Sequence, residues 1–148
     1  MSQDNEQHYQ QGLEALFSDK GIGALVTLKV DGRPQISNVV YWFDQVQQTF
    51  RISVTDTRAK TTNLRRDPRV SLHVSSEDGW SYAVAEGRAE LSPPASDPHD
   101  ATVAELILLY QNLSGEHPDW DEYRMAMIRE RRLVLTIHVE RVYGKTQE

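Results

Sequence analysis

The stretch SVTDTRAKTTNLRRDPR, residues 53–69, decides how the chain is organised. It follows a predicted strand at residues 50–55 and contains a predicted helix at residues 58–67, which lacks strand alternation and ends before Pro68. A helix start offers free backbone N–H groups and the positive end of its dipole, and both favour an anion. The sequence therefore predicts a bend between strand and helix that is suited to binding an anion.

The side chains of this bend suit a phosphate group in particular. Arg58 can donate two parallel hydrogen bonds to phosphate oxygens, and Lys60 adds a point charge. Thr55, Thr57 and Thr61 supply hydroxyl donors. An ordinary strand-to-helix junction capped by a threonine explains the same residues equally well. Two interpretations are therefore open, a phosphate clamp and a capped junction.

The positive charge of the chain is concentrated at the same place. The 148 residues carry a net charge of −6, yet five cations and one anion between Arg58 and Arg69 make that window +4 and leave the remainder at −10. This pattern favours a local anionic ligand such as a small molecule, and no nucleic-acid partner is expected. A solvated basic helix face is the alternative interpretation.

The remaining elements are predicted from the periodicity of apolar residues. Further strands are expected at residues 22–30, 36–43, 70–75, 80–91 and 133–139, with hairpin turns at Asp31-Gly32 and at residues 77–79. Helices are expected at residues 7–18, after an N-cap at Asp97, and after a capping box formed by Asp119 and Glu122. Six antiparallel strands with peripheral helices predict a mainly β, closed or partly closed barrel in a single domain, residues 1–148. Periodicity alone does not separate a barrel from a sandwich.

Several kinds of chemistry are not expected. The chain has no cysteine, no apolar run as long as a membrane span and no signal-peptide core, which suits a cytoplasmic protein without a membrane partner. The five histidines, at positions 8, 73, 99, 117 and 138, lack the spacing of metal ligands, so no metal site is expected. Phosphate-loop and nucleophile-elbow motifs are absent. No side chain is identified as a catalytic acid or base.

Two aromatic positions have two interpretations each. Trp80 and Tyr82 open a strand directly after a turn, and Trp120 lies at the start of a helix. Such residues belong either to the core or to the wall of a slot for a planar ligand, and the core is the commoner case.

These residues resemble a known family. The chain is similar to the pyridoxamine 5′-phosphate oxidase-like split barrels, and within them to the actinobacterial deazaflavin (coenzyme F-420)-dependent oxidoreductases. The resemblance extends from about residue 16 to residue 144. The pattern Lys60-x-x-Asn63-Leu64-x-x-Asp67-Pro68-Arg69 is typical of the whole group, whereas residues 78–82 (DGWSY) and 115–117 (GEH) are typical of the deazaflavin branch. The resemblance implies a six-stranded antiparallel split β-barrel of the FMN-binding type.

The resemblance also implies a homodimer with two cofactor sites along the subunit interface, for coenzyme F-420 or alternatively FMN. Arg58 and Lys60 match phosphate-binding positions, and residues 53–57 match a strand edge along the cofactor ring. We also assign the basic side chains at positions 65, 66 and 69, as a hypothesis, to the oligoglutamate tail of F-420. The full set of expected cofactor contacts is Asn38, Ser53, Val54, Thr55, Asp56, Thr57, Arg58, Ala59, Lys60, Trp80, Ser81, Tyr82, Ala83 and Trp120.

The activity implied by the resemblance is hydride transfer from the reduced deazaflavin to a small conjugated acceptor, such as an enone or a quinone. The cofactor performs this chemistry, while the protein aligns the ring and excludes water. Solvent or Tyr82 is the candidate proton donor. The alternatives are an FMN-binding flavoprotein and a non-catalytic carrier or sensor of F-420. The last strand lacks the arginine-rich ending of the true oxidases, so oxidation of their substrate is not expected.

Overall fold

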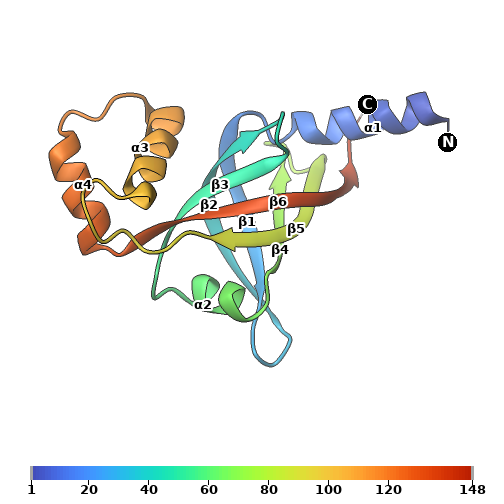
Figure 1. Cartoon of the computed structure of the whole chain (residues 1–148). Helices are drawn as coiled ribbons and strands as arrows, with labels where there is room; N and C mark the ends of the chain where they lie inside the picture. Colours follow the sequence, from blue (N-terminus) through green and yellow to red (C-terminus); the bar gives the residue numbers. More distant parts are fainter. Residues whose placement is uncertain (1, 148) are drawn as a thin grey trace.

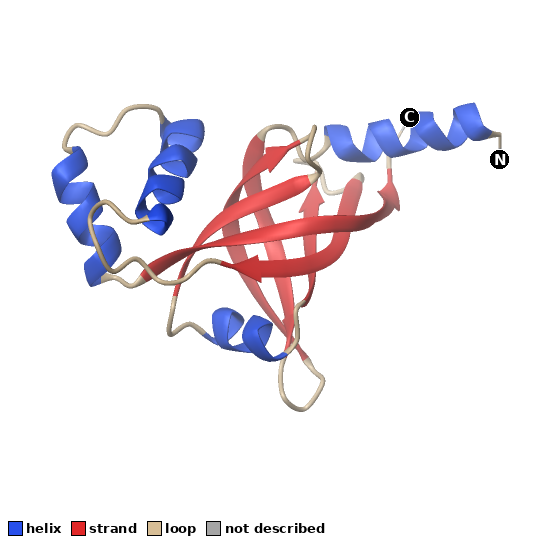
Figure 2. Ribbon diagram, in the orientation of Figure 1, coloured by secondary structure: helices blue, strands red, loops and turns tan. Residues whose placement is uncertain are grey.

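The computed structural model describes residues 2–147, and among these residues six antiparallel strands close into a barrel with helices around it (Figure 1; Figure 2). The expected mainly β barrel is confirmed, and a sandwich is excluded. Around the barrel the strands follow the order β1-β2-β3-β6-β5-β4. The strands are β1 (Lys20–Leu28), β2 (Pro34–Asp44), β3 (Thr49–Thr55), β4 (Arg69–Ser75), β5 (Tyr82–Leu91) and β6 (Arg132–Lys145). The helices are α1 (Gln3–Ala15), α2 (Ala59–Arg66), α3 (Ala101–Ser114) and α4 (Trp120–Arg129).

The two ends of the barrel are closed differently. At the α2 end, the C-terminus of β3 leads through α2 into β4, and Thr61, Asn63 and Leu64 of α2 are buried against the barrel. The Asn63 amide donates a hydrogen bond to Thr27 Oγ1 of β1 at 3.1 Å. At the opposite end of the barrel, which we call the hairpin end, the turn between β4 and β5 lies on the side where α1 projects (Figure 1).

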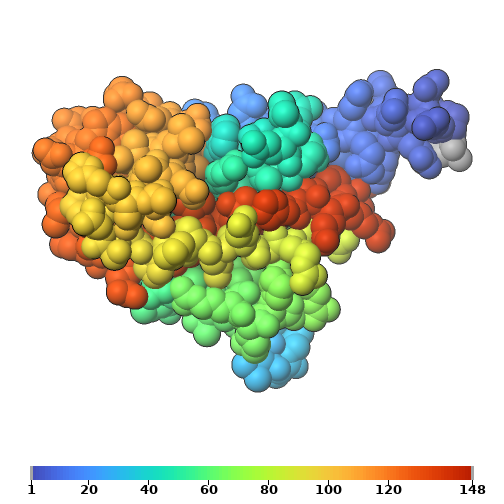
Figure 3. Space-filling model, in the orientation of Figure 1, coloured from blue at the N-terminus to red at the C-terminus, as the bar shows by residue number. Residues whose placement is uncertain are grey.

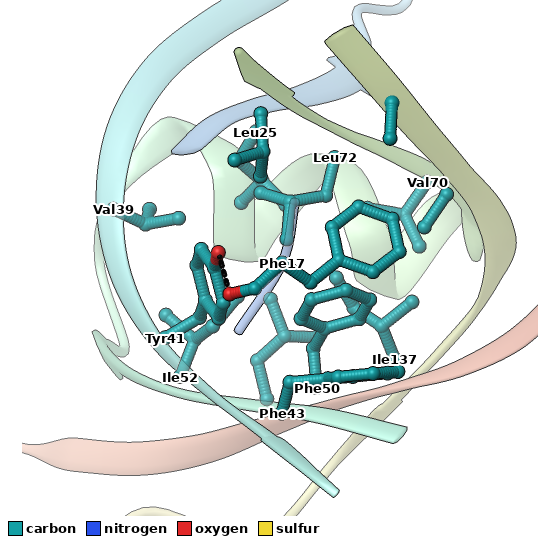
Figure 4. Close-up of a cluster of buried hydrophobic side chains, with 14 of the residues drawn as sticks. Phe17, Leu25, Val39, Tyr41, Phe43, Phe50, Ile52, Val70, Leu72 and Ile137 are labelled. Carbon is teal, nitrogen blue, oxygen red and sulfur yellow. Dashed lines mark hydrogen bonds between the residues drawn. The ribbon is translucent and has the colours of Figure 1, made fainter. Parts of the chain in front are cut away.

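Aromatic side chains fill the middle of the barrel (Figure 4). Phe17, which follows α1, lies edge-on to Phe50 with ring centroids 5.0 Å apart, and Phe43 stacks on Phe50 at 4.6 Å. The Tyr41 hydroxyl donates a 2.6 Å hydrogen bond to the backbone carbonyl of Phe17, shown dashed in Figure 4. Both Phe17 and Tyr41 are buried. This bond satisfies two buried polar groups and ties the segment after α1 to β2.

The outer face of β1 and β2 is apolar and exposed. Strand alternation turns Leu25 into the core and leaves Ile22 67% exposed, and on β2 it leaves Ile36 61% and Val40 51% exposed. These side chains are neighbours, because Ile22 pairs with Val40 and Val26 with Ile36. We call this surface the β1–β2 face; its residues are Ile22, Ala24, Val26, Ile36, Asn38 and Val40. A contiguous apolar patch of this kind is typical of an interaction surface.

The barrel is incompletely closed between β2 and β3. These strands pair at only three positions, from Trp42–Arg51 to Asp44–Thr49, although β2 has 11 residues and β3 has 7. Residues 34–41 of β2 and 52–55 of β3 therefore face each other without ladder partners on that side. We call this gap the β2–β3 seam; it opens toward α2.

Some local expectations are corrected. The N-cap of α3 is Asp100, not Asp97, because the Asp100 carboxylate accepts hydrogen bonds from the backbone of Val103 and also of Ser96 and Asp97. Asp119 does cap α4, but its own N–H donates to His117 Nδ1, so the predicted capping box is only half formed. The predicted helix at residues 7–18 begins earlier, at Gln3, and the strand predicted from residue 80 begins at Tyr82.

Tyr41→Phe is expected to destabilise the protein by about 1–2 kcal/mol, because it leaves the buried Phe17 carbonyl without its donor. Urea unfolding measures this change, and Tyr143→Phe, at an exposed position, is the control with little effect. Burial raises the pKa of Tyr41 from 10.0 to about 12. The stabilisation of the fold by the neutral hydroxyl is therefore complete below pH 10.0 and is lost as the pH rises toward 12. Equal stabilities of the two variants would contradict this account.

Candidate functional site

The predicted anion-binding bend lies at the mouth of the β2–β3 seam. Lys60 Nζ reaches across from α2 to Ser37 Oγ of β2 at 3.4 Å. The Thr61 hydroxyl donates to the Thr55 carbonyl at 2.8 Å, and the Arg58 N–H donates to the same carbonyl at 3.2 Å. The structure thus brings residues 53–60 together with the part of β2 that carries Ser37 and Asn38.

The start of α2 is not capped by a threonine. The N-cap of α2 is Arg58, whose side chain makes no capping hydrogen bond, so the expected capping threonine is not found. Within residues 2–147, neither Arg58 nor Lys60 forms an ion pair with an acidic side chain. Burial, followed by the charges of Arg58 and Arg132, lowers the pKa of Lys60. An anion would offset this crowding of positive charge.

Asp56 has a structural task in the bend. Its carboxylate accepts hydrogen bonds from Arg65 of α2 and from Arg131, whose Nη2 lies 2.9 Å away. These two hydrogen bonds are the main cause that lowers the pKa of Asp56. Asp56 fixes the geometry of the bend, because its carboxylate is engaged and its backbone N–H and C=O bond to Arg131 and Arg65 as well.

The other cations of the +4 window are also engaged. Arg66 donates to the Leu28 carbonyl, and Arg69 binds the Asp67 carboxylate at 2.8 Å. With Arg65 held by Asp56, the structure argues against our hypothesis that these three arginines bind an anionic tail. The cations that remain for a ligand in this window are Arg58 and Lys60.

The second predicted part of the site lies at the other end of the barrel. Trp80 is 68% exposed in the turn before β5, and Tyr82 stacks on His73 of β4 with centroids 5.7 Å apart. The seven residues of β4 separate this hairpin end from the α2 end by about 20 Å. One chain alone therefore does not bring Trp80–Tyr82 to Lys60. Two further predicted contacts, Val54 and Ala83, point into the core, and Ala83 pairs with β4 on one side and β6 on the other.

Trp120 belongs to an aromatic cluster between α3 and α4, the lobe beside the barrel in Figure 3. Its ring packs against Tyr110, His117 and Tyr123, with centroids 5.5–5.7 Å away. The indole N–H donates to Glu116 Oε2 at 3.1 Å. These contacts explain Trp120 as the anchor of the helical lobe, and the structure of one chain does not bring it to the bend.

Two residues at the bend were not predicted from the sequence. Ser37 is at the bend because Lys60 contacts it across the seam. Arg132 lies 72 positions after Lys60 along the chain. Arg132 reaches the bend because it pairs in register with Thr55. Neither position carries a sequence signal that could have revealed it before the strand pairing was known.

No group of three histidine or acidic side chains in residues 2–147 is placed to hold a metal ion. None of the described helices combines the length and the apolar character that a membrane crossing requires.

Comparisons with known proteins agree with the fold. Residues 10–146 match the family described as pyridoxamine 5′-phosphate oxidase. The F-420H(2)-dependent biliverdin reductase of Mycobacterium tuberculosis is 28% identical over 130 residues, which cover 88% of this chain and 83% of that protein. A solved F-420 reductase has a TM-score of 0.67 at 23% identity, covering 89% of this chain and 96% of that one. A conserved hypothetical protein from M. tuberculosis has a TM-score of 0.63 at 20% identity, covering 97% and 84%.

Asp56→Asn is expected to lower the stability of the protein at neutral pH, because it weakens the ties to Arg65 and Arg131. The pKa of Asp56 in the folded protein is lowered from 3.8. The stabilisation by its carboxylate is therefore present above pH 3.8 and is lost as the pH falls through the pKa of the folded state. Urea midpoints of wild type and variant should therefore converge in acid. Asp19→Asn, at an exposed position, is the control. A constant difference at every pH would contradict this role.

Proposed function

The chain belongs to the pyridoxamine 5′-phosphate oxidase family, and on that premise we propose that it is an oxidoreductase that uses coenzyme F-420 to reduce a small conjugated acceptor. The observation that carries the proposal is the β2–β3 seam, which ends at Arg58 and Lys60, two cations without an acidic partner among the described residues. The choice of F-420 is supported by the two relatives named as F-420-dependent or F-420 reductases.

In this proposal the phosphate lies at the bend and the ring lies along the seam. Arg58, Lys60 and the first backbone N–H groups of α2 would hold the phosphate. The edge of β3 at residues 53–55 has no ladder partner on the side facing β2. Backbone N–H and C=O groups require hydrogen-bond partners, and the polar edge of a flavin-type ring can supply them. Asn38 on the opposing strand is the side-chain contact expected there.

The proposed site needs two copies of the chain. The β1–β2 face is apolar and exposed, which supports a homodimer formed through it. A two-fold axis that lies in this interface and runs across the strands would turn one copy end over end, so that the hairpin end of one subunit approaches the α2 end of the other. Such a dimer would bring the partner's Trp80 and Tyr82 to the seam that carries Lys60. Two equivalent sites follow from the symmetry.

When bound, the reduced deazaflavin would supply a hydride to the acceptor. The residues of the chain position the reactants and exclude water. Arg58 and Lys60 would anchor the phosphate, and the exposed Trp80 of the partner would cover the ring. The Tyr82 hydroxyl is the candidate proton donor, and its ring is held by stacking on His73 at 5.7 Å. The acceptor would occupy the open side of the ring.

FMN is the second candidate cofactor, because it combines a flat ring with a terminal phosphate that the same two cations would hold. A carrier or sensor of F-420 would use the same site without turnover. Titration of the purified protein with F-420 and with FMN, followed by fluorescence, separates the two cofactors. Binding of F-420 with a Kd in the micromolar range or below is expected. Turnover of reduced F-420 with enones, quinones and biliverdin then separates an enzyme from a carrier.

Matched variants show whether binding uses the bend. Lys60→Gln and Arg58→Gln should each weaken F-420 binding at least tenfold, because each removes a charge-assisted contact with the phosphate. Lys29→Gln, in the exposed turn between β1 and β2, is the control and should bind as wild type does. If the wild-type protein binds neither F-420 nor FMN, the proposed function is wrong.

The dimer makes a separate prediction. Ile36→Glu and Val40→Glu place charge in the middle of the β1–β2 face, where both side chains are more than half exposed in one chain. Each variant should fold yet sediment as a monomer and lose cofactor binding. Val46→Glu, at a 94% exposed position between β2 and β3, should remain dimeric. Analytical ultracentrifugation measures the oligomeric state of each protein. A monomeric wild-type protein would refute the site shared between two subunits.

A further inference from the structure

The turn between α4 and β6 directs two consecutive arginines to different partners. Arg131 has a left-handed backbone with φ of 51°, which L-residues with a side chain rarely adopt. Its guanidinium binds Asp56 at 2.9 Å, so this conformation is held by a contact to the bend. The next residue, Arg132, begins β6 and pairs in register with Thr55, the last residue of β3.

Arg132 is therefore the third cation near the bend. Its charge acts on Lys60, whose pKa is lowered first by burial, then by Arg58 and then by Arg132. Its side chain is 31% exposed, so it is accessible from solvent. Unlike Arg58 and Lys60, it comes from the far end of the sequence and reaches the site through strand pairing.

Arg132 already has an acidic partner, but the contact is a weak one. Its Nε and Nη2 both donate to the same oxygen of Glu130, at 3.4 and 3.2 Å. The Glu130 side chain is 47% exposed. Two parallel hydrogen bonds to two oxygens make the strong arginine–carboxylate pair, and this arrangement lacks them. Exposed pairs of this kind contribute little and are readily exchanged.

We propose that Arg132 is a third phosphate-binding residue of the site, and that Glu130 is an internal competitor which the phosphate displaces from it. This inference rests on the proposed function, because it assumes a phosphate-bearing ring in the β2–β3 seam. A phosphate can accept two parallel hydrogen bonds from the guanidinium, which Glu130 does not. The exchange replaces the weak Arg132–Glu130 pair by a stronger Arg132–phosphate pair. Because Glu130 competes for Arg132, it lowers the affinity of the site for phosphate.

The exchange predicts opposite effects for the two members of the pair. Arg132→Gln should weaken the binding of FMN and F-420 roughly tenfold, whereas Glu130→Gln should tighten it several-fold, because the competitor is gone. Arg132→Lys keeps the charge and should restore part of the affinity. None of these variants should change the affinity for riboflavin or for the deazaflavin without its phosphate. Arg129→Gln breaks a similar exposed pair, with Glu122 at 2.8 Å, and is the matched control.

Dissociation constants from fluorescence titration of the full chain decide the matter. Equal weakening of phosphorylated and unphosphorylated rings by Arg132→Gln would show a merely structural role and overturn the inference. Unchanged affinities in Arg132→Gln would also overturn the inference. Weaker binding of FMN and F-420 by Glu130→Gln would overturn it too. If Arg132→Gln binds as wild type does while Lys60→Gln does not, the inference fails and the proposed function stands.

A second measurement does not depend on the ring. Inorganic phosphate titrated into the labelled protein should shift the backbone amide signals of residues 57–60 in nuclear magnetic resonance spectra. The shifts should require higher phosphate concentrations in Arg132→Gln and lower ones in Glu130→Gln. Shifts that are the same in all variants would overturn the inference, even if the wild-type protein binds neither F-420 nor FMN.

Discussion

The limited pairing of β2 with β3 is the constraint on which the rest of the molecule depends. Only three residue pairs join these strands, so the barrel is held closed near Trp42 and open toward α2. Full pairing would have satisfied the backbone groups of residues 52–55 and left no edge for a ligand. At this end of the barrel α2 contributes the buried residues Thr61, Asn63 and Leu64, and Lys60 reaches Ser37 across the mouth of the gap.

The aromatic core makes this open seam compatible with a stable fold. Phe17, Tyr41 and Phe50 contact one another near the closed part of the barrel, and the Tyr41 hydroxyl binds the Phe17 carbonyl at 2.6 Å. These contacts join the segment after α1 to the part of the barrel where β2 and β3 pair. The bend at the other end is held by a different device, the two ion pairs of Asp56.

The sequence was sufficient for the strands, the hairpin turns and the basic bend, because each depends on local pattern. Alternation located β1 but could not say which side faces inward: Leu25 is buried, whereas Ile22 is exposed beside Val40. The N-cap of α3 was misplaced because Asp97 and Asp100 carry the same side chain, and only the fold shows which carboxylate meets Val103. Ser37 and Arg132 join the bend through long-range contacts that no local pattern encodes.

Counting charges along the sequence overstated the positive charge of the bend, because two of its arginines are paired with acidic residues. It also missed Arg132, which lies outside the segment. Asp56 and Asp67 bind Arg65 and Arg69, so four charged residues of the segment largely cancel one another. Arg58, Lys60 and Arg66 remain, of which Arg66 donates to the Leu28 carbonyl, and Arg132 joins them from another part of the chain. A ligand therefore meets a small group of cations at the end of a strand edge, on a chain whose net charge is −6. Such a group suits a single phosphate, because its attraction is confined to the mouth of the seam.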